Sequence, residues 1–154
     1  MILSLLLAIA TPVPGAEILG RVVAITDGDT ITVLDGGHRQ AKVRLSGIDA
    51  PEKSQAFGTR SRQRLAELVA GREVIVEWDK KDRYGRILGR VLVDGEDINL
   101  RMVREGMAWH YTAFSKSPEL QVAEVAARQG RLGLWSGPFP VAPWDFRRAG
   151  RGKR

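Results

Sequence analysis

The chain has 154 residues, enough for one domain with its own hydrophobic core. It has no cysteine, and its two histidines, His38 and His110, are far apart, which excludes disulfide bonds, thiolate zinc sites and histidine-rich metal sites, so any metal must bind oxygen. The net charge of +6 is concentrated in residues 147–154, where five basic side chains and no acidic one occur, and the rest of the chain is nearly neutral.

Residues 1–16 are typical of a secretory signal peptide. They carry no charged side chain, and the apolar run over residues 2–10 is interrupted only by Ser4. This run is much shorter than the ~20 residues of a membrane-spanning helix, and the prolines after it would end a helix before small residues suited to cleavage near Ala16. We therefore expect a secreted or periplasmic protein with no stable membrane span after cleavage. Because the run lacks an N-terminal Lys or Arg, an uncleaved anchor and a start codon assigned too far downstream are the competing interpretations.

Residues 17–146 predict one domain that begins with strands. The apolar, β-branched stretch 18–26 stops at Asp27-Gly28, which indicates a strand followed by a tight turn. Residues 30–34 predict a second strand, and Asp35-Gly36-Gly37 predicts the hairpin turn that ends it.

The third predicted strand, residues 41–47, has alternating faces. Ala41, Val43 and Leu45 share the apolar face, so Arg44 projects away from it. The elements predicted after it are a helix over 57–70, strands over 73–78 and 87–93, a short helix over 100–106, and a helix over 118–129 that follows the N-cap Ser117.

Five short strands, with one helix after the third strand and the other helices at the end, fit a closed barrel better than a parallel sheet. We therefore predict an OB-fold, a five-stranded β-barrel with three α-helices. Residues 147–154 are predicted to form a basic disordered tail. This tail either adds nonspecific attraction to nucleic acid or serves only solubility.

Three short motifs carry the polar residues of chemical interest: Asp27-Gly28-Asp29-Thr30, Asp49-Ala50-Pro51-Glu52 and Asp82-Arg83-Tyr84-Gly85-Arg86. Each motif alone is also typical of an ordinary turn or helix cap. A barrel, however, places the end of the first hairpin beside the end of the third strand, so these acids can converge near Arg44. Carboxylates bracketed by arginines suit a hard divalent cation that holds an anionic ester.

These motifs together resemble those of the thermonuclease family, the staphylococcal nuclease-like domains, over residues 20–135. The further matching motifs are Val43-Arg44-Leu45, Val103-Arg104-Glu105-Gly106 and Leu134-Trp135-Ser136. The resemblance implies the OB barrel and a monomeric, calcium-dependent endonuclease that hydrolyses DNA and RNA with low sequence specificity and leaves 3′-phosphate ends.

The resemblance also implies a ligand set and a catalytic set. Asp29 and Asp49 would bind calcium, with the main-chain carbonyl of Ala50 as a third ligand. The family often has Thr at this last position, but a main-chain ligand survives that change. The implied catalytic residues are Arg44, which would neutralise the phosphate, Glu52, which would orient or deprotonate the attacking water, and Arg86, which would stabilise the transition state or leaving oxygen.

The remaining roles implied by the resemblance are supporting ones. Asp27 would be an outer acid of the metal site. Arg83 and Tyr84 match residues that contact the terminal phosphate of a nucleotide, although the family commonly has Lys where Arg83 stands. Tyr111 would lie near the base, a role that Trp109 could share, and ordinary packing is the alternative for both aromatic residues.

The sequence is compatible with two metals and with two functions. Oxygen-only ligation favours calcium, and magnesium shares that preference. The competing function is a noncatalytic nucleic-acid-binding OB-fold module, which would keep the fold without turnover. Retention of Glu52 argues against it, because a protein that only binds does not need a carboxylate to activate water.

Overall fold

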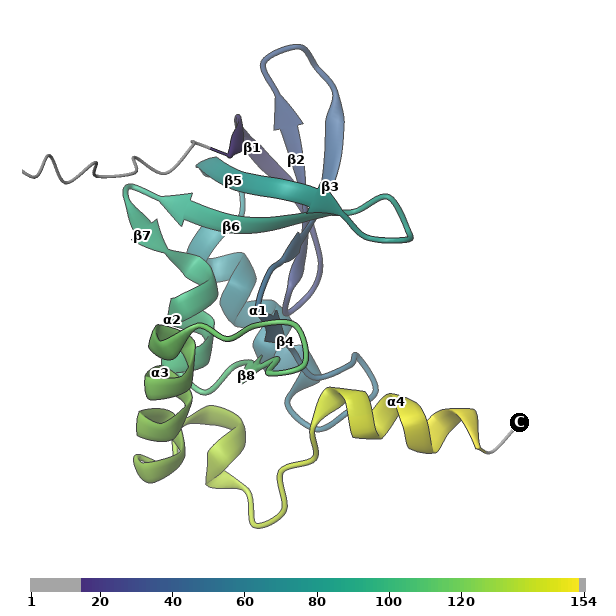
Figure 1. Cartoon of the computed structure of the whole chain (residues 1–154), viewed down its shortest axis with the longest axis vertical. Coiled ribbons are helices and arrows are strands. Elements are labelled where there is room, and N and C mark those ends of the chain that lie inside the picture. The colour runs from purple at the N-terminus through teal and green to yellow at the C-terminus, as the bar shows by residue number, and fades with distance from the viewer. Residues whose placement is uncertain (1–14, 153–154) are drawn as a thin grey trace, which may run out of the picture.

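Five strands form a closed β-barrel in the computed structural model, which describes residues 15–152 (Figure 1). They are β1 (Ala16–Asp27), β2 (Thr30–Asp35), β3 (Gln40–Leu45), β5 (Glu73–Lys81) and β6 (Ile87–Val93). The antiparallel order is β3-β2-β1-β5-β6, and a parallel pairing of β3 with β6 closes the barrel. The predicted five-stranded OB-type barrel is confirmed. The predicted signal peptide lies outside the described residues, apart from Gly15 and Ala16.

The barrel closes around an apolar interior because its strands alternate as the sequence predicts. Val43 and Leu45 on β3 are fully buried, as are Ile31 and Val33 on β2. Irregularities in the register of β1, on either side of Ala24, let this long strand pair with β2 near one end and with β5 near the other.

Helices cover one end of the barrel (Figure 1). The helical elements are α1 (Gly58–Val69), α2 (Ile98–Arg104), α3 (Pro118–Gln129), the 3-10 turn η1 (Gly133–Ser136) and α4 (Pro143–Arg151). The short strands are β4 (Ile48–Asp49), which pairs with β8 (Trp109–His110), and β7 (Glu96–Asp97), which pairs antiparallel with the end of β6. The three predicted helices are found within two residues of their expected bounds. None of the helices in residues 15–152 has the length and hydrophobicity to cross a membrane.

The fourth helix, α4, differs from the sequence prediction, which placed a disordered tail at residues 147–154. The structure describes this segment up to residue 152 and shows helix as far as Arg151. Pro143 occupies the first turn, where a backbone N–H would have no partner within the helix, so the N–H that proline lacks is not missed. Asp145 in the first turn and Arg148 in the last turn complement the two ends of the helix dipole. The prediction rested on the charge of the segment and on Gly150 and Gly152, and it overlooked this helix-start signal.

Gly106, which follows α2, and Gly133, the first residue of η1, lie against each other. Gly106 and Gly133 both have positive φ, at 71° and 53°, and a Cβ on either one would collide with main-chain atoms, including the Gly106 oxygen in the case of Gly133. The Leu134 N–H donates to the Gly106 carbonyl at 2.9 Å. This contact directs the chain from α3 back along the body toward α4.

Asn99 on α2 connects the helices to the barrel end. Its side chain is buried, its Oδ1 accepts from the Val91 N–H at 3.0 Å, and its Nδ2 donates to the carbonyls of Ser46 and Gly89 at 2.9 and 3.0 Å. Ser46 lies in the loop between β3 and β4. The amide therefore fixes the loop that leads from Arg44 to Asp49.

We expect Asn99→Ala to lower the free energy of unfolding by about 2 to 4 kcal/mol, because it leaves buried backbone groups without partners. Urea unfolding measures this change. Arg21→Ala is the control, since its ion pair with Glu73 is exposed at 3.2 Å and its loss should cost only about 0.5 kcal/mol or less. Equal stabilities of the two variants would contradict the role assigned to Asn99.

Candidate active site

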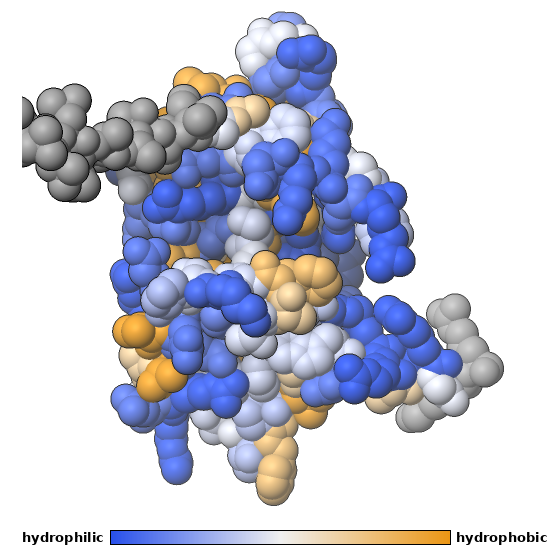
Figure 2. Space-filling view, in the orientation of Figure 1, coloured by the Kyte–Doolittle hydropathy of each residue, from blue (hydrophilic) through white to orange (hydrophobic). Residues whose placement is uncertain are grey.

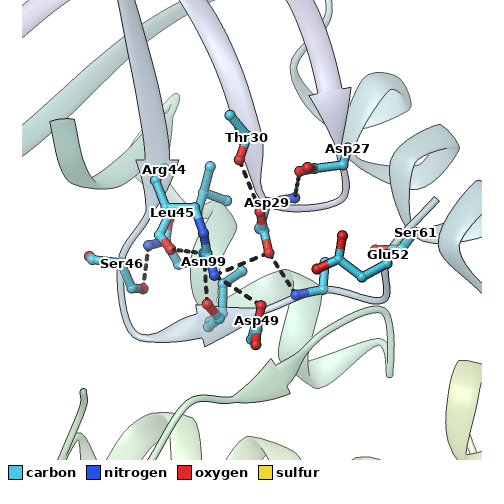
Figure 3. Close-up of polar contacts among 12 residues, drawn as sticks. Asp27, Asp29, Thr30, Arg44, Leu45, Ser46, Asp49, Glu52, Ser61 and Asn99 are labelled. Carbon is cyan, nitrogen blue, oxygen red and sulfur yellow. Dashed lines mark hydrogen bonds and ion pairs between the residues drawn. The ribbon is translucent and has the colours of Figure 1, made fainter. Parts of the chain in front are cut away.

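Acidic residues from two separate loops meet beside Arg44 (Figure 3). Asp29 lies in the turn between β1 and β2, and Asp49 lies in β4. Thr30 pairs with Arg44 across β2 and β3, and the Leu45 N–H donates to the Asp29 carbonyl at 2.8 Å. The barrel register thus places the Asp29 turn next to the end of β3, as the sequence predicts.

Gly28 allows the first loop to pack directly on the second. A Cβ at this position would collide with the Ser61 side chain on α1 and would lie 2.8 Å from the Ala50 Cβ. Ser61 is itself fixed, because its hydroxyl donates to the Met107 carbonyl at 2.6 Å. The glycine in the Asp-Gly-Asp motif is therefore required by close approach of the two loops.

The Arg44 guanidinium links both acids and is itself held by the backbone. Its Nη2 lies 3.0 Å from Asp49 Oδ1 and 3.3 Å from Asp29 Oδ2. Its Nη1 donates to the carbonyls of Leu45 and Ile48, each at 2.8 Å. The Arg44 side chain is only 12% exposed. Three hydrogen bonds and one ion pair to fixed partners leave this guanidinium little freedom to move.

Asp29 is buried, and its pKa is raised above the ordinary value. Its Oδ2 accepts from the Ala50 N–H at 2.7 Å, and its Oδ1 accepts from the Thr30 hydroxyl at 3.0 Å. Asp27, at the rim of the same turn, accepts from the Asp29 N–H at 3.1 Å. Burial raises the pKa of Asp29 to about 7, against the opposing effect of Arg44. Nearby positive charge therefore only partly offsets the cost of burying this carboxylate.

Glu52 and Asp49 share a second guanidinium, which comes from α4. Arg147 Nη1 donates to Glu52 Oε1 at 2.8 Å and to Asp49 Oδ1 at 3.2 Å, and Arg147 Nη2 donates to Asp49 Oδ2 at 2.8 Å. The Asp49 side chain is 2% exposed and that of Glu52 is 38% exposed. Sequence reasoning missed Arg147 because it assigned this residue to the tail.

Arg86, Arg83 and Tyr84 form a separate group on the turn between β5 and β6. Arg86 Nε donates to Asp82 Oδ2 at 2.7 Å. Burial alone would raise the pKa of Asp82, but hydrogen bonds from Arg86 and the turn backbone lower it below its ordinary value. The guanidinium of Arg86 also lies 5.5 Å from the Tyr84 ring centroid. In residues 15–152, none of these three side chains bonds to Asp29, Asp49 or Glu52.

Tyr111 lies at the rim of the site, and Trp109 is part of the packing beneath it. The Tyr111 N–H donates to the Gly47 carbonyl at 2.9 Å, in the loop before β4. Its ring is stacked on Trp144 of α4, with centroids 5.1 Å apart and planes 4° apart. Trp109 is buried and lies 4.4 Å from Trp135. The rim position keeps Tyr111 as the candidate for contact with a base, whereas Trp109 is placed in a packing role.

The donor set around Arg44 consists of oxygen atoms. Asp29 and Asp49 approach the same guanidinium nitrogen, and the Ala50 carbonyl follows directly in the chain. No group of three or more His, Cys, Asp or Glu side chains suited to a metal occurs in residues 15–152. Two carboxylates with a main-chain carbonyl nevertheless match the oxygen ligands of calcium or magnesium, with water as the remaining ligands.

Comparison with known proteins gives consistent matches. A family model described as staphylococcal nuclease homologue matches residues 42–137. The chain is 48% identical over 137 residues to an "uncharacterized endonuclease" of Escherichia coli, covering 88% of this chain and 89% of that protein. It is 47% identical over 147 residues to a "micrococcal nuclease" of Shigella flexneri, covering 88% and 84%. An "uncharacterized endonuclease" of Haemophilus influenzae is 46% identical over 128 residues, covering 83% and 72%.

The raised pKa of Asp29 makes the stability depend on pH. Between its ordinary value of 3.8 and about 7, the folded chain holds a proton on Asp29 that the unfolded chain has lost. The free energy of unfolding therefore falls as the pH rises through this window. We expect the stability of the parent relative to Asp29→Asn, measured by urea unfolding in a chelator, to fall with pH and then level off above about pH 7.

Asp79→Asn provides the matched control, because Asp79 is exposed and the substitution is chemically the same. The stability of the parent relative to this variant should show no comparable slope over the same pH range. A pH-independent difference for Asp29→Asn would contradict the assignment.

Proposed function

This chain belongs to the family of staphylococcal nuclease homologues and is a phosphodiester-hydrolysing endonuclease, and from this premise we propose that it cleaves DNA and RNA with calcium and leaves 3′-phosphate ends. Nucleic acid is its class of substrate. The observation that carries the proposal is the Arg44 guanidinium fixed between two carboxylates from separate loops, at 3.0 and 3.3 Å. Family resemblance supplies the calcium requirement, the range of substrates and the product ends.

Asp29, Asp49 and the Ala50 carbonyl are the proposed ligands. When bound, calcium would supply positive charge for a non-bridging phosphate oxygen. Asp29 is suited to this role because its Oδ2 and Asp49 Oδ1 approach the same Arg44 nitrogen, which brings the two carboxylates together. Asp27 supports the arrangement indirectly, since it accepts from the Asp29 N–H and so holds the turn.

Arg44 has two tasks in the proposed reaction. Its Nη groups are occupied by the two acids and by backbone carbonyls, so they position Asp29 and Asp49. Its fixed positive charge would also lower the cost of the additional negative charge that forms on the phosphate. Arg86 would add a second guanidinium from the turn between β5 and β6, oriented by Asp82.

Glu52 is the proposed general base. Its side chain is 38% exposed, so water can reach the carboxylate, and its loop follows directly on Asp49. It would orient the attacking water and take its proton while Arg44 stabilises the phosphate. Because these contacts are made to phosphate, little discrimination among bases is expected. Arg83, Tyr84 and Tyr111 would contact the flanking parts of the nucleotide.

We expect Glu52→Gln to reduce turnover by about 10²- to 10⁴-fold, because it removes the proton acceptor and keeps the side-chain shape. Calcium affinity, measured by titration calorimetry, should change little. Glu119→Gln, at an exposed position on α3, is the matched control and should cleave at the parental rate. Parental turnover by Glu52→Gln would show that another group is the base.

We expect the parent to cleave single- and double-stranded DNA and RNA in calcium, and Asp29→Ala to need a higher calcium concentration because one ligand is lost. The measurement is cleavage of the four substrates in calcium, in magnesium and in a chelator, with chemical analysis of the product ends. Binding of nucleic acid without cleavage in excess calcium would favour the noncatalytic module instead. Ends with a free 3′-hydroxyl would contradict the proposed products.

A further inference from the structure

Helix α4 reaches the active site through two side chains on one face. Arg147 contacts Asp49 and Glu52, and Trp144 stacks on Tyr111. Arg148 instead points to solvent, with 80% of its side chain exposed. The outward surface around α4 is mostly hydrophilic (Figure 2). The segment before α4 is attached by a further bond, from Gln55 Nε2 to the Val141 carbonyl at 2.6 Å.

Arg147 covers the oxygens of two proposed functional groups. It bonds both oxygens of Asp49, at 2.8 and 3.2 Å, and one oxygen of Glu52, at 2.8 Å. The hydrogen bond to Asp49 raises the pKa of Arg147, so its positive charge is permanent at any physiological pH. Asp49 therefore carries two guanidinium groups, one from Arg44 in the barrel and one from α4.

Trp144, on the same helix, covers the ring of Tyr111. Its ring is parallel to that of Tyr111, at a centroid distance of 5.1 Å, and it meets Trp109 edge-on at 5.5 Å. A planar group stacked on Tyr111 occupies the space that a base would need for the same contact. The two side chains of α4 therefore lie on the proposed base contact and on the proposed cation and water contacts.

Bound calcium and Arg147 compete for the same carboxylate. A cation on Asp49 would lie beside a guanidinium that is held within 3.2 Å of both oxygens, and the two positive charges would repel each other. Arg147 also occupies Glu52 Oε1, at 2.8 Å, so this oxygen is not free to bond the attacking water. Arg44 differs from Arg147 because it bonds to the backbone of its own loop, whereas Arg147 depends on the docking of α4.

We propose that α4 is an autoinhibitory latch, in which Arg147 and Trp144 close the active site and are displaced when a divalent cation and nucleic acid bind. This inference rests on the proposed function, because it assigns regulation to the same site. Coupling is reciprocal: docked α4 weakens cation binding, and the cation weakens docking by the same factor. The latch consists of few contacts on a nine-residue helix, which makes it an element that can open without unfolding the barrel.

The first test is calcium titration calorimetry on the full-length protein without nucleic acid. Arg147→Ala should bind calcium about 5- to 10-fold more tightly than the parent, because the competing charge is gone. Arg148→Ala removes the same charge from the same helix and should bind as the parent does, since its nearest acidic partner is Asp145 on α4 itself, at 3.5 Å. Arg147→Lys keeps the charge but loses the two-pronged contact, so its affinity should be intermediate.

The second test is hydrogen exchange of the α4 amides. Calcium should accelerate exchange in residues 144–151 of the parent, and exchange in Arg147→Ala should be fast already without calcium. Thermal unfolding of each variant verifies that the barrel is intact. Cleavage at limiting calcium should be faster for Arg147→Ala than for Arg148→Ala.

Failures of the latch and of the proposed function are distinguishable. If the parent binds calcium and cleaves but Arg147→Ala binds it equally or less tightly, the latch is overturned and the nuclease function stands. Unchanged exchange of α4 on calcium binding would also overturn the latch. If neither protein binds calcium, the proposed cofactor fails and the latch fails with it.

Discussion

The site depends on one guanidinium, that of Arg44, which bonds to two acids and two backbone carbonyls at once. Its position follows from the barrel, because β3 pairs with β2 on one side and with β6 on the other. The two acids come from loops about 20 residues apart in the chain, and the shared guanidinium nitrogen holds their carboxylates within hydrogen-bonding distance of one point. Without it, the buried carboxylate of Asp29 would lose its guanidinium partner, and Asp49 would depend on Arg147 of α4 alone.

The same arrangement carries a cost in stability. Burial raises the pKa of Asp29 to about 7, which shows that the surrounding charges do not fully repay the desolvation of this carboxylate. A well-packed apolar group in the same place would cost less free energy on folding. The presence of the acid is therefore explained by its chemistry and not by the stability of the fold. The protein compensates in neighbouring positions, where Gly28 permits close packing of the loops and Asn99 satisfies buried backbone groups.

Local patterns in the sequence were sufficient for the barrel and for the approach of Asp29 and Asp49 to Arg44. Alternation placed Arg44 opposite the buried face of β3, and the hairpin register then brought Asp29 to the end of that strand. Docking of α4 was not predictable in this way, because it depends on contacts between Arg147 and acids almost 100 residues earlier in the chain. The helix itself was predictable from Pro143, but the high positive charge of the segment favoured a disordered interpretation. Arg86 shows the opposite case, a motif residue that the structure keeps paired with Asp82 and apart from the acids.

The apposed glycines at the end of α2 and the start of η1 have a consequence for how this protein can vary. A side chain at Gly106 is blocked by the main chain of Leu132, and one at Gly133 is blocked by the main chain of Gly106. A substitution at either position is therefore not repaired by a smaller residue at the other, since no residue is smaller than glycine. Both positions therefore require glycine, and the chain downstream of this junction, including Trp144, starts from a fixed point on the body.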